Sequence, residues 1–296
     1  MKIINTQDGQ YKKPGAGACI GGVMAGGVVQ SIVQRPHQLI VTKILDKMNN
    51  ISNNLSNDEF ENVNSAIVKT LDKTGLSKKG VSVLKVTADN MDELSNVMSN
   101  EINANKITKK LPEFIKRMQA KNISETVLEG DNAFYTFVTK KVVVPEGKSL
   151  ALSVFHELGH AANSNLSKIG KFLQKRRKLS LLAIPISFIA LWKTKKAPGE
   201  QPKNKIDKAT TFVKENVGKL TLAAFLPTLV EEGMATVKGN KFAKNLLDPS
   251  LAKKVSKTNT MAYASYLCLA VLSSFGIYLG TKIKDYIAKP KPVNQV

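Results

Sequence analysis

The chain has 296 residues, 43% hydrophobic and 23% charged, which excludes a disordered protein and an ordinary polytopic transporter. Its 44 Lys and Arg outnumber its 23 Asp and Glu, so the formal net charge is +21. Only four of the basic residues are Arg, the side chain best suited to reading guanine, so we expect no specific nucleic-acid partner. The Lys surplus fits an anionic membrane surface as a partner, although an AT-rich genome produces the same bias.

Cysteine usage excludes two further classes. Cys19 and Cys268 are the only cysteines in the sequence, too few for a disulfide scaffold or a zinc site built from thiolates. Both lie in apolar stretches, where we expect them to act as small packing residues.

Four uncharged stretches divide the chain. Residues 15–34 hold six glycines at a spacing that lets membrane helices pack closely, with a Gly-rich loop or a soluble helix as the alternatives. Residues 179–192 and 220–230 are too short to span, since 14 helical residues cover roughly 21 Å of a roughly 30 Å hydrocarbon core. Residues 261–280, flanked by lysines, are the best candidate for a transmembrane helix.

The two short stretches raise the question of topology. Each contains a proline, and a Lys-rich linker, residues 193–219, joins them. If both spanned, this linker would lie outside, against the positive-inside tendency. We therefore favour a re-entrant or interfacial pair that dips into the cytoplasmic leaflet, with buried core helices as the alternative. The expected location is the cell membrane, as a multi-pass protein or a peripheral one with an anchor, and with the catalytic region cytoplasmic.

Residues 35–148 read as a soluble region. Apolar spacing predicts helices over residues 39–48 and 60–71, and two more within residues 91–118, separated near Asn105. Residues 81–86 predict a strand. Residues 133–144 are rich in β-branched and aromatic residues and predict one strand or a tight hairpin.

A metal-binding pattern follows that strand. Ser149 is placed to cap a helix on which His156 and His160 are four residues apart, so both imidazoles emerge from one face. This spacing lets two nitrogens reach one Zn²⁺, and Glu157 projects beside the metal, where it can take a proton from water. Gly159 would allow a neighbouring backbone to approach closely.

A catalytic zinc needs a third protein ligand. His37 is the only other histidine and precedes the soluble region in an expected Pro-His-Gln turn, so we expect a carboxylate instead. Glu231 and Glu232 follow the apolar residues 220–230, where charge is otherwise costly. Adjacent helical residues differ by about 100° in direction, so both acids cannot face the metal. The apolar neighbours do not decide between them.

These motifs resemble the membrane zinc metallopeptidases that include the CAAX prenyl proteases and the bacterial heat-shock membrane protease. The sequence HELGH is followed, after 71 intervening residues, by EGMA at residues 232–235, with apolar stretches between. The resemblance covers about residues 129–242. It implies a gluzincin fold, one Zn²⁺ per chain, and cleavage of a protein or peptide substrate near a membrane.

The resemblance also assigns roles. It implies zinc ligands at His156, His160 and Glu232, with Glu231 as the runner-up left to solvent or to a supporting role, and Glu157 as the general base. It implies that Asn132, Ala133 and Phe134 form an edge strand that holds substrate. The family usually has Asp where this chain has Thr236, so the group supporting a zinc histidine carries no charge here.

The predicted fold class is α+β, mainly helical, with a zincin-like metallopeptidase core, a small sheet and inserted or flanking membrane helices. The predicted organisation is a basic lead with a Gly-rich segment (1–34), a mostly helical soluble region (35–128), the edge strand and zinc helix (129–178), the hydrophobic pair with its linker (179–230), the third-ligand helix (231–260), the transmembrane helix (261–280) and a basic tail (281–296).

The leading functional hypothesis is a membrane-associated zinc endopeptidase. One alternative is a non-catalytic membrane protein on the same scaffold, which the intact Glu157 disfavours and Thr236 leaves open. Another is a basic membrane- or nucleic-acid-associated protein in which the motif occurs by chance. Metal content and activity after loss of Glu157 distinguish the three.

Overall fold

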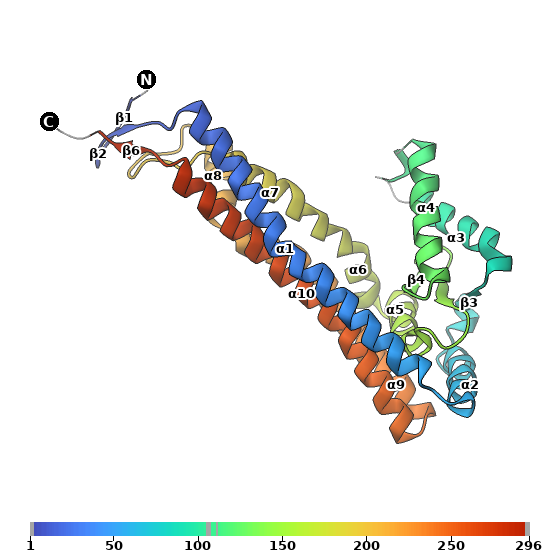
Figure 1. Cartoon of the computed structure of the whole chain (residues 1–296). Coiled ribbons are helices and arrows are strands. Elements are labelled where there is room, and N and C mark those ends of the chain that lie inside the picture. Colours follow the sequence, from blue (N-terminus) through green and yellow to red (C-terminus); the bar gives the residue numbers. More distant parts are fainter. Residues whose placement is uncertain (1–2, 105–107, 111, 294–296) are drawn as a thin grey trace. The chain divides into compact units, whose positions relative to one another are not determined.

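The computed structural model describes residues 3–104, 108–110 and 112–293, and shows a mainly helical chain with two small sheets (Figure 1). The helices are α1 (Ala16–Asn53), α2 (Asn57–Lys73), α3 (Met91–Ala104), α4 (Glu113–Leu128), α5 (Val154–Leu166), α6 (Lys168–Arg176), α7 (Ala183–Trp192), α8 (Lys205–Glu215), α9 (Val217–Leu246) and α10 (Pro249–Ile287). The strands are β1 (Ile3–Thr6), β2 (Gly9–Lys12), β3 (Ser82–Val86), β4 (Phe134–Tyr135), β5 (Lys141–Pro145) and β6 (Lys291–Pro292). This confirms the mainly helical α+β class.

The chain forms two compact units. The first, which we call the helical unit, comprises residues 1–40, 177–227 and 267–296. The second, the motif unit, comprises residues 41–176 and 228–266. Each is described separately below.

The sheet of the motif unit has the strand order β3-β5-β4. Strand β3 pairs in parallel with β5, and β4 pairs antiparallel with β5 through a short connection, which confirms the hairpin alternative. Within the described part of the chain β4 pairs with β5 alone, so its other edge has no neighbouring strand there.

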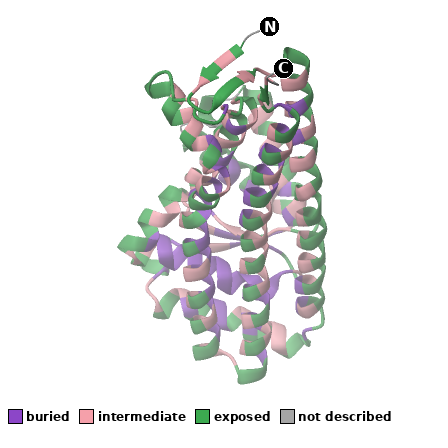
Figure 2. Cartoon of the chain, turned by 90° about the vertical axis from the view of Figure 1, so that its left-hand side faces the viewer, coloured by how far each residue is buried: buried purple, intermediate pink, exposed green. Residues whose placement is uncertain are grey.

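Alternation along β5 builds the core of this unit on both faces of the sheet. Val142 and Val144 belong to one cluster, with apolar residues of α2, α5 and the nearby ends of α9 and α10. Val143 points the other way, into a second cluster formed with α3 and α4. The buried residues of the chain are shown in Figure 2. The sheet is thus covered on both faces, and the apolar residues of α5 belong to the first cluster.

In the helical unit, α1 and α10 meet through glycines. A Cβ added at Gly26 would lie 2.6 Å from the carbonyl oxygen of Gly280, and one added at Gly280 would lie 2.4 Å from that of Gly26. Gly22, one turn earlier, faces Lys284 and Ala288. The Gly-rich stretch is therefore helical from Ala16 onward rather than a loop, and its small-residue spacing packs one helix against another as predicted.

The same helices expose apolar faces. α1 presents Ile20, Met24, Val28 and Ile32 at intervals of one turn, and α7 presents Ile184, Phe188 and Trp192 in the same way. Among the described residues, α1, α9 and α10 are long and apolar enough to cross a membrane. These faces indicate membrane association, because contiguous apolar surface of this kind is costly in water.

The expectation of a short re-entrant segment at residues 220–230 is wrong in extent. The helix α9 continues without a break from Val217 to Leu246, through Pro227 and through both acids. The apolar run stops at Val230 in the sequence, but the helix does not stop, because Glu231 and Glu232 have partners inside the motif unit.

Two local expectations are also corrected. His37 lies within α1 rather than in a turn, since Pro36 is accommodated inside that helix. Ser149 does not cap the motif helix: Leu150 adopts a left-handed conformation (φ 51°), a 3₁₀ turn over Ala151–Ser153 follows, and α5 begins at Val154. The Ser149 hydroxyl instead donates to Asn53, 3.3 Å away.

The close approach of α1 and α10 gives a test with a neighbouring control. Gly26→Ala places a methyl group against the Gly280 carbonyl oxygen and should destabilise the helical unit by about 1–3 kcal/mol. Gly27→Ala meets nothing within 4 Å and should be neutral or slightly stabilising. Thermal unfolding in a mild neutral detergent compares the two, and equal midpoints would contradict this packing.

Candidate metal site

The helix α5 buries its histidines. All residues from Val154 to Ser164 are buried, including both imidazoles and Glu157, which is 7% exposed. A helix that is buried on every side must be surrounded by other elements, and its polar groups need partners there.

Glycines bring α9 directly onto α5. A Cβ added at Gly159 would lie 2.1 Å from the carbonyl oxygen of Ala235, and one added at Gly239 would lie 2.4 Å from that of Phe155. No side chain fits between the two backbones at these points, which confirms the predicted role of Gly159 and adds Gly239. This contact places Glu231 and Glu232 beside the two histidines.

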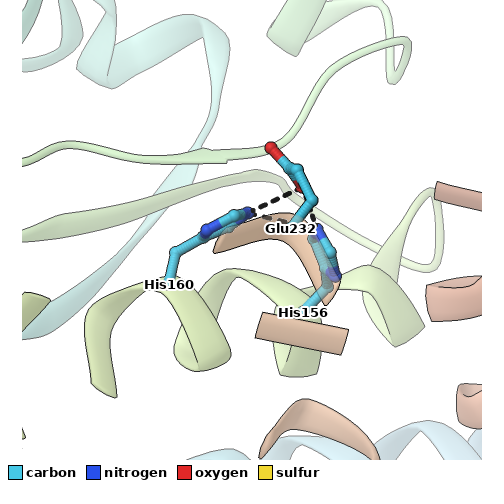
Figure 3. Close-up of side chains that lie close together, drawn as sticks. All are labelled: His156, His160 and Glu232. Carbon is cyan, nitrogen blue, oxygen red and sulfur yellow. Dashed lines mark hydrogen bonds and ion pairs between the residues drawn. The ribbon is translucent and has the colours of Figure 1, made fainter. Parts of the chain in front are cut away.

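His156, His160 and Glu232 converge on one point (Figure 3). The His156 Nε2 lies 3.0 Å from Glu232 Oε2 and 3.1 Å from His160 Nε2, and the His160 Nε2 lies 3.3 Å from the same oxygen. Three ligands of a tetrahedral ion with bonds of about 2.0–2.1 Å would be about 3.3 Å apart. The described residues therefore include a buried group that could hold a metal ion.

The hydrogen bonds of the two outer nitrogens, Nδ1, determine which ring nitrogen carries the hydrogen and which, the inner Nε2, keeps a lone pair. His160 Nδ1 lies 2.9 Å from Glu231 Oε1, an acceptor when ionised, so Nδ1 carries a hydrogen and donates. His156 Nδ1 lies 3.3 Å from the Thr236 hydroxyl, which in turn lies 3.5 Å from the Asn259 carbonyl oxygen. A hydroxyl that donates to that carbonyl accepts from Nδ1–H. When both imidazoles are neutral, each directs an Nε2 lone pair at Glu232.

Three acceptors facing one another repel unless a proton or a metal cation lies between them. Two ionised carboxylates and two neutral imidazoles carry two negative charges, which a divalent cation balances. This donor set of two imidazoles and one carboxylate fits a divalent transition metal rather than Ca²⁺ or Mg²⁺, which prefer oxygen ligands alone.

Glu231 is fully buried and supports the site. Its carboxylate also accepts from Asn163 Nδ2 at 2.9 Å, and the same amide donates to the Glu231 carbonyl oxygen at 3.2 Å. The two adjacent acids thus have different roles. Glu232 lies at the converging point, and Glu231 accepts a hydrogen bond from Nδ1 of His160 on the side away from that point. Sequence reasoning missed Asn163, although it lies on α5 three residues after His160, on the same face.

The other predicted residues lie around this group. Glu157 is on α5 beside His156, outside the three converging groups. Phe134 lies in the edge strand β4, whereas Asn132 and Ala133 form the segment just before it. Ala133 packs against the cluster that contains α5, and Phe134 packs against the other cluster.

Comparison with protein-family models, curated proteins and solved structures gives no match for this chain. The chemistry of the site therefore follows from its own residues.

Burial and two carboxylates have opposite effects on the pKa of His160. Burial disfavours its charged form, but the carboxylates of Glu232 and Glu231 outweigh burial and raise the pKa of His160 to about 10. A proton and a metal ion therefore compete for this imidazole, because only the neutral form offers a lone pair.

Substitution of each acid should separate their roles. Glu232→Gln removes a ligand and should abolish stoichiometric metal binding. Glu231→Gln removes only the support of His160 and should keep one metal ion per chain, with an affinity about 10–100-fold lower. Metal content is measured after equilibration with buffered free metal. The reverse pattern would move the ligand to Glu231, and full retention in both variants would exclude this segment.

Metal affinity should also depend on pH. Below about pH 10, metal binding displaces one proton from His160, so the apparent affinity should rise about tenfold per pH unit between pH 6 and 9. In Glu231→Gln the pKa of His160 is lower, so the rise should level off at a lower pH. A pH-independent affinity in the unmodified protein would contradict the predicted competition.

Proposed function

We propose that this chain is a membrane-associated zinc endopeptidase with a zincin-like core. The observation that carries the proposal is the triangle of His156 Nε2, His160 Nε2 and Glu232 Oε2, with sides of 3.0 to 3.3 Å. Two imidazoles and one carboxylate form a known ligand set of catalytic zinc, which leaves a fourth position for water or substrate.

Glu157 is the general base of the proposed reaction. When bound, zinc would supply a Lewis acid that polarises the scissile carbonyl and acidifies a water molecule. The Glu157 carboxylate accepts a proton from that water as it attacks the carbonyl carbon, and then passes the proton to the leaving amine. Its nearly complete burial favours proton exchange at the reacting atoms over exchange with bulk water.

The free edge of β4 is the proposed binding strand for substrate. An extended peptide can add to this edge through main-chain hydrogen bonds, with Asn132, Ala133 and Phe134 alongside it. Main-chain pairing of this kind holds a peptide extended, which presents a single scissile bond to the site.

The membrane location of the proposed enzyme rests on α1, α9 and α10, which have the length and composition of membrane spans. The helical unit also has lysines near the C-terminal ends of α7, α8 and α10. Lys214 and Lys284 both donate to the carbonyl oxygen of Lys193 at the end of α7, and Lys193 and Lys196 pair with Asp207. We propose that this end of the helical unit faces an anionic cytoplasmic leaflet.

Loss of the general base tests the function directly. Glu157→Gln should keep one zinc per chain and lower peptide hydrolysis by about 100- to 10,000-fold, the usual contribution of acid–base catalysis. Glu125→Gln, an exposed acid on α4 of the same unit, should change neither property.

The assay uses the full chain in neutral detergent, with zinc content and cleavage of a denatured protein measured on the same samples. Equal hydrolysis by the unmodified protein and by Glu157→Gln would overturn the proposed mechanism. Zinc binding without any hydrolysis by the unmodified protein would favour a non-catalytic protein on the same scaffold.

A further inference from the structure

A lysine-lined cavity of about 650 Å³ lies within the motif unit. It is bounded by the tip of the β4–β5 hairpin, the end of α5 and the following helix α6. Its lining contains five lysines and no acidic residue: Lys79, Lys140, Lys168, Lys171 and Lys175. Converging positive charge in a concave site attracts an anionic group.

Packing holds these lysines around the cavity. A Cβ added at Gly170 would lie 2.6 Å from the Asn163 carbonyl oxygen, so α6 packs directly on the end of α5. Lys171 and Lys175 lie one turn apart on α6. Lys140 Nζ donates to the Lys79 carbonyl oxygen at 2.8 Å, which ties the hairpin tip to the 3₁₀ turn before β3.

One acid at this hairpin, Glu101, already has partners. The Glu101 Oε1 accepts from the backbone amides of Val138 and Thr139, at 2.7 and 3.0 Å. It does not belong to the lining of the cavity. The lysines therefore keep their charge available for a ligand.

Two elements that pass the metal site, α5 and the β4–β5 hairpin, also border the cavity. Ser164, Asn165 and Leu166 line it from the end of α5, and Asn165 donates to the Tyr135 hydroxyl of β4 at 2.9 Å. From His160 to Asn165 the helix rises about 7.5 Å, the length of about two residues of extended peptide. A peptide along the free edge of β4 thus reaches the cavity about two or three residues from the metal.

We propose that this cavity is a substrate subsite for an acidic side chain, two or three residues from the scissile bond. The inference rests on the proposed peptidase function. A concave site lined from four separate segments fits one side chain of an extended peptide better than a planar membrane surface. The exposed apolar residues of α6, Ile169 and Phe172, are not among its lining residues.

The test uses the zinc-loaded full chain in neutral detergent and pairs of peptides that differ by Glu or Gln at each position near the cleaved bond. We expect kcat/KM to be about tenfold higher for Glu at one position, and the preference to shrink in high salt. Lys171→Gln with Lys175→Gln should reduce the preference to about twofold.

Lys69→Gln with Lys73→Gln is the matched control, because these exposed lysines are also one turn apart, on α2 of the same unit. It should leave the preference unchanged. Lys171→Glu with Lys175→Glu should reverse the preference, so that the peptide with Lys at that position is cleaved faster. This variant keeps the result informative if neutralisation alone has a small effect.

Each outcome decides a different claim. Equal cleavage of the Glu and Gln peptides at every position overturns the subsite and leaves the peptidase intact. If the unmodified protein cleaves no peptide, the peptidase proposal fails, and fluorescence anisotropy with Glu157→Gln then decides whether the cavity still binds the Glu peptide in preference to the Gln peptide. If Lys171→Gln with Lys175→Gln loses binding to phosphatidylglycerol vesicles and keeps the peptide preference, the cavity is a membrane contact and the inference is overturned.

Discussion

The site depends on one contact between two helix backbones. Gly159 of α5 faces the carbonyl of Ala235, and Gly239 of α9 faces the carbonyl of Phe155, so neither helix can withdraw by the width of a side chain without losing the site. Because α9 lies this close, a Glu side chain from it reaches two imidazoles of α5 with heavy-atom distances of 3.0 and 3.3 Å. Both glycines therefore determine where the ligand side chains lie, although neither glycine contacts them.

This contact also explains why α9 can carry two adjacent acids in an apolar helix. Burial of a carboxylate is costly unless it is paired, and here each acid contacts a different histidine nitrogen. Glu232 faces the inner nitrogens and Glu231 faces the outer nitrogen of His160. The direction change of about 100° between neighbouring helical residues makes this division possible. Thr236, one turn after Glu232, lies against Nδ1 of His156 as Glu231 lies against Nδ1 of His160. The hydroxyl of Thr236 carries no charge, so its support of the imidazole is weaker.

Much of this could be predicted from the sequence, because the signals were local. The spacing of His156 and His160 requires only a helix, and the β-branched and aromatic residues at 133–144 predict extended structure, although they leave one strand and a hairpin as alternatives. The spacing of Gly22 and Gly26 likewise predicted close packing of helices.

What could not be predicted depends on contacts between distant segments. The continuity of α9 past Val230 requires knowledge that Glu231 and Glu232 meet histidines some seventy residues away. The choice between those two acids was close from neighbouring residues alone, because both faces of the helix carry apolar side chains. The sequence predicts the start of α5 too early, because Leu150 adopts a left-handed conformation that its residue type does not favour.

We propose that two imidazoles and one carboxylate hold a single zinc ion. X-ray absorption at the zinc edge, on the full chain loaded with one equivalent of zinc, tests it most directly. We expect nitrogen and oxygen ligands at about 2.0–2.1 Å, with the multiple-scattering pattern of two imidazoles and no sulfur. A spectrum with fewer than two imidazoles, with sulfur ligands, or of zinc that remains fully hydrated would contradict it.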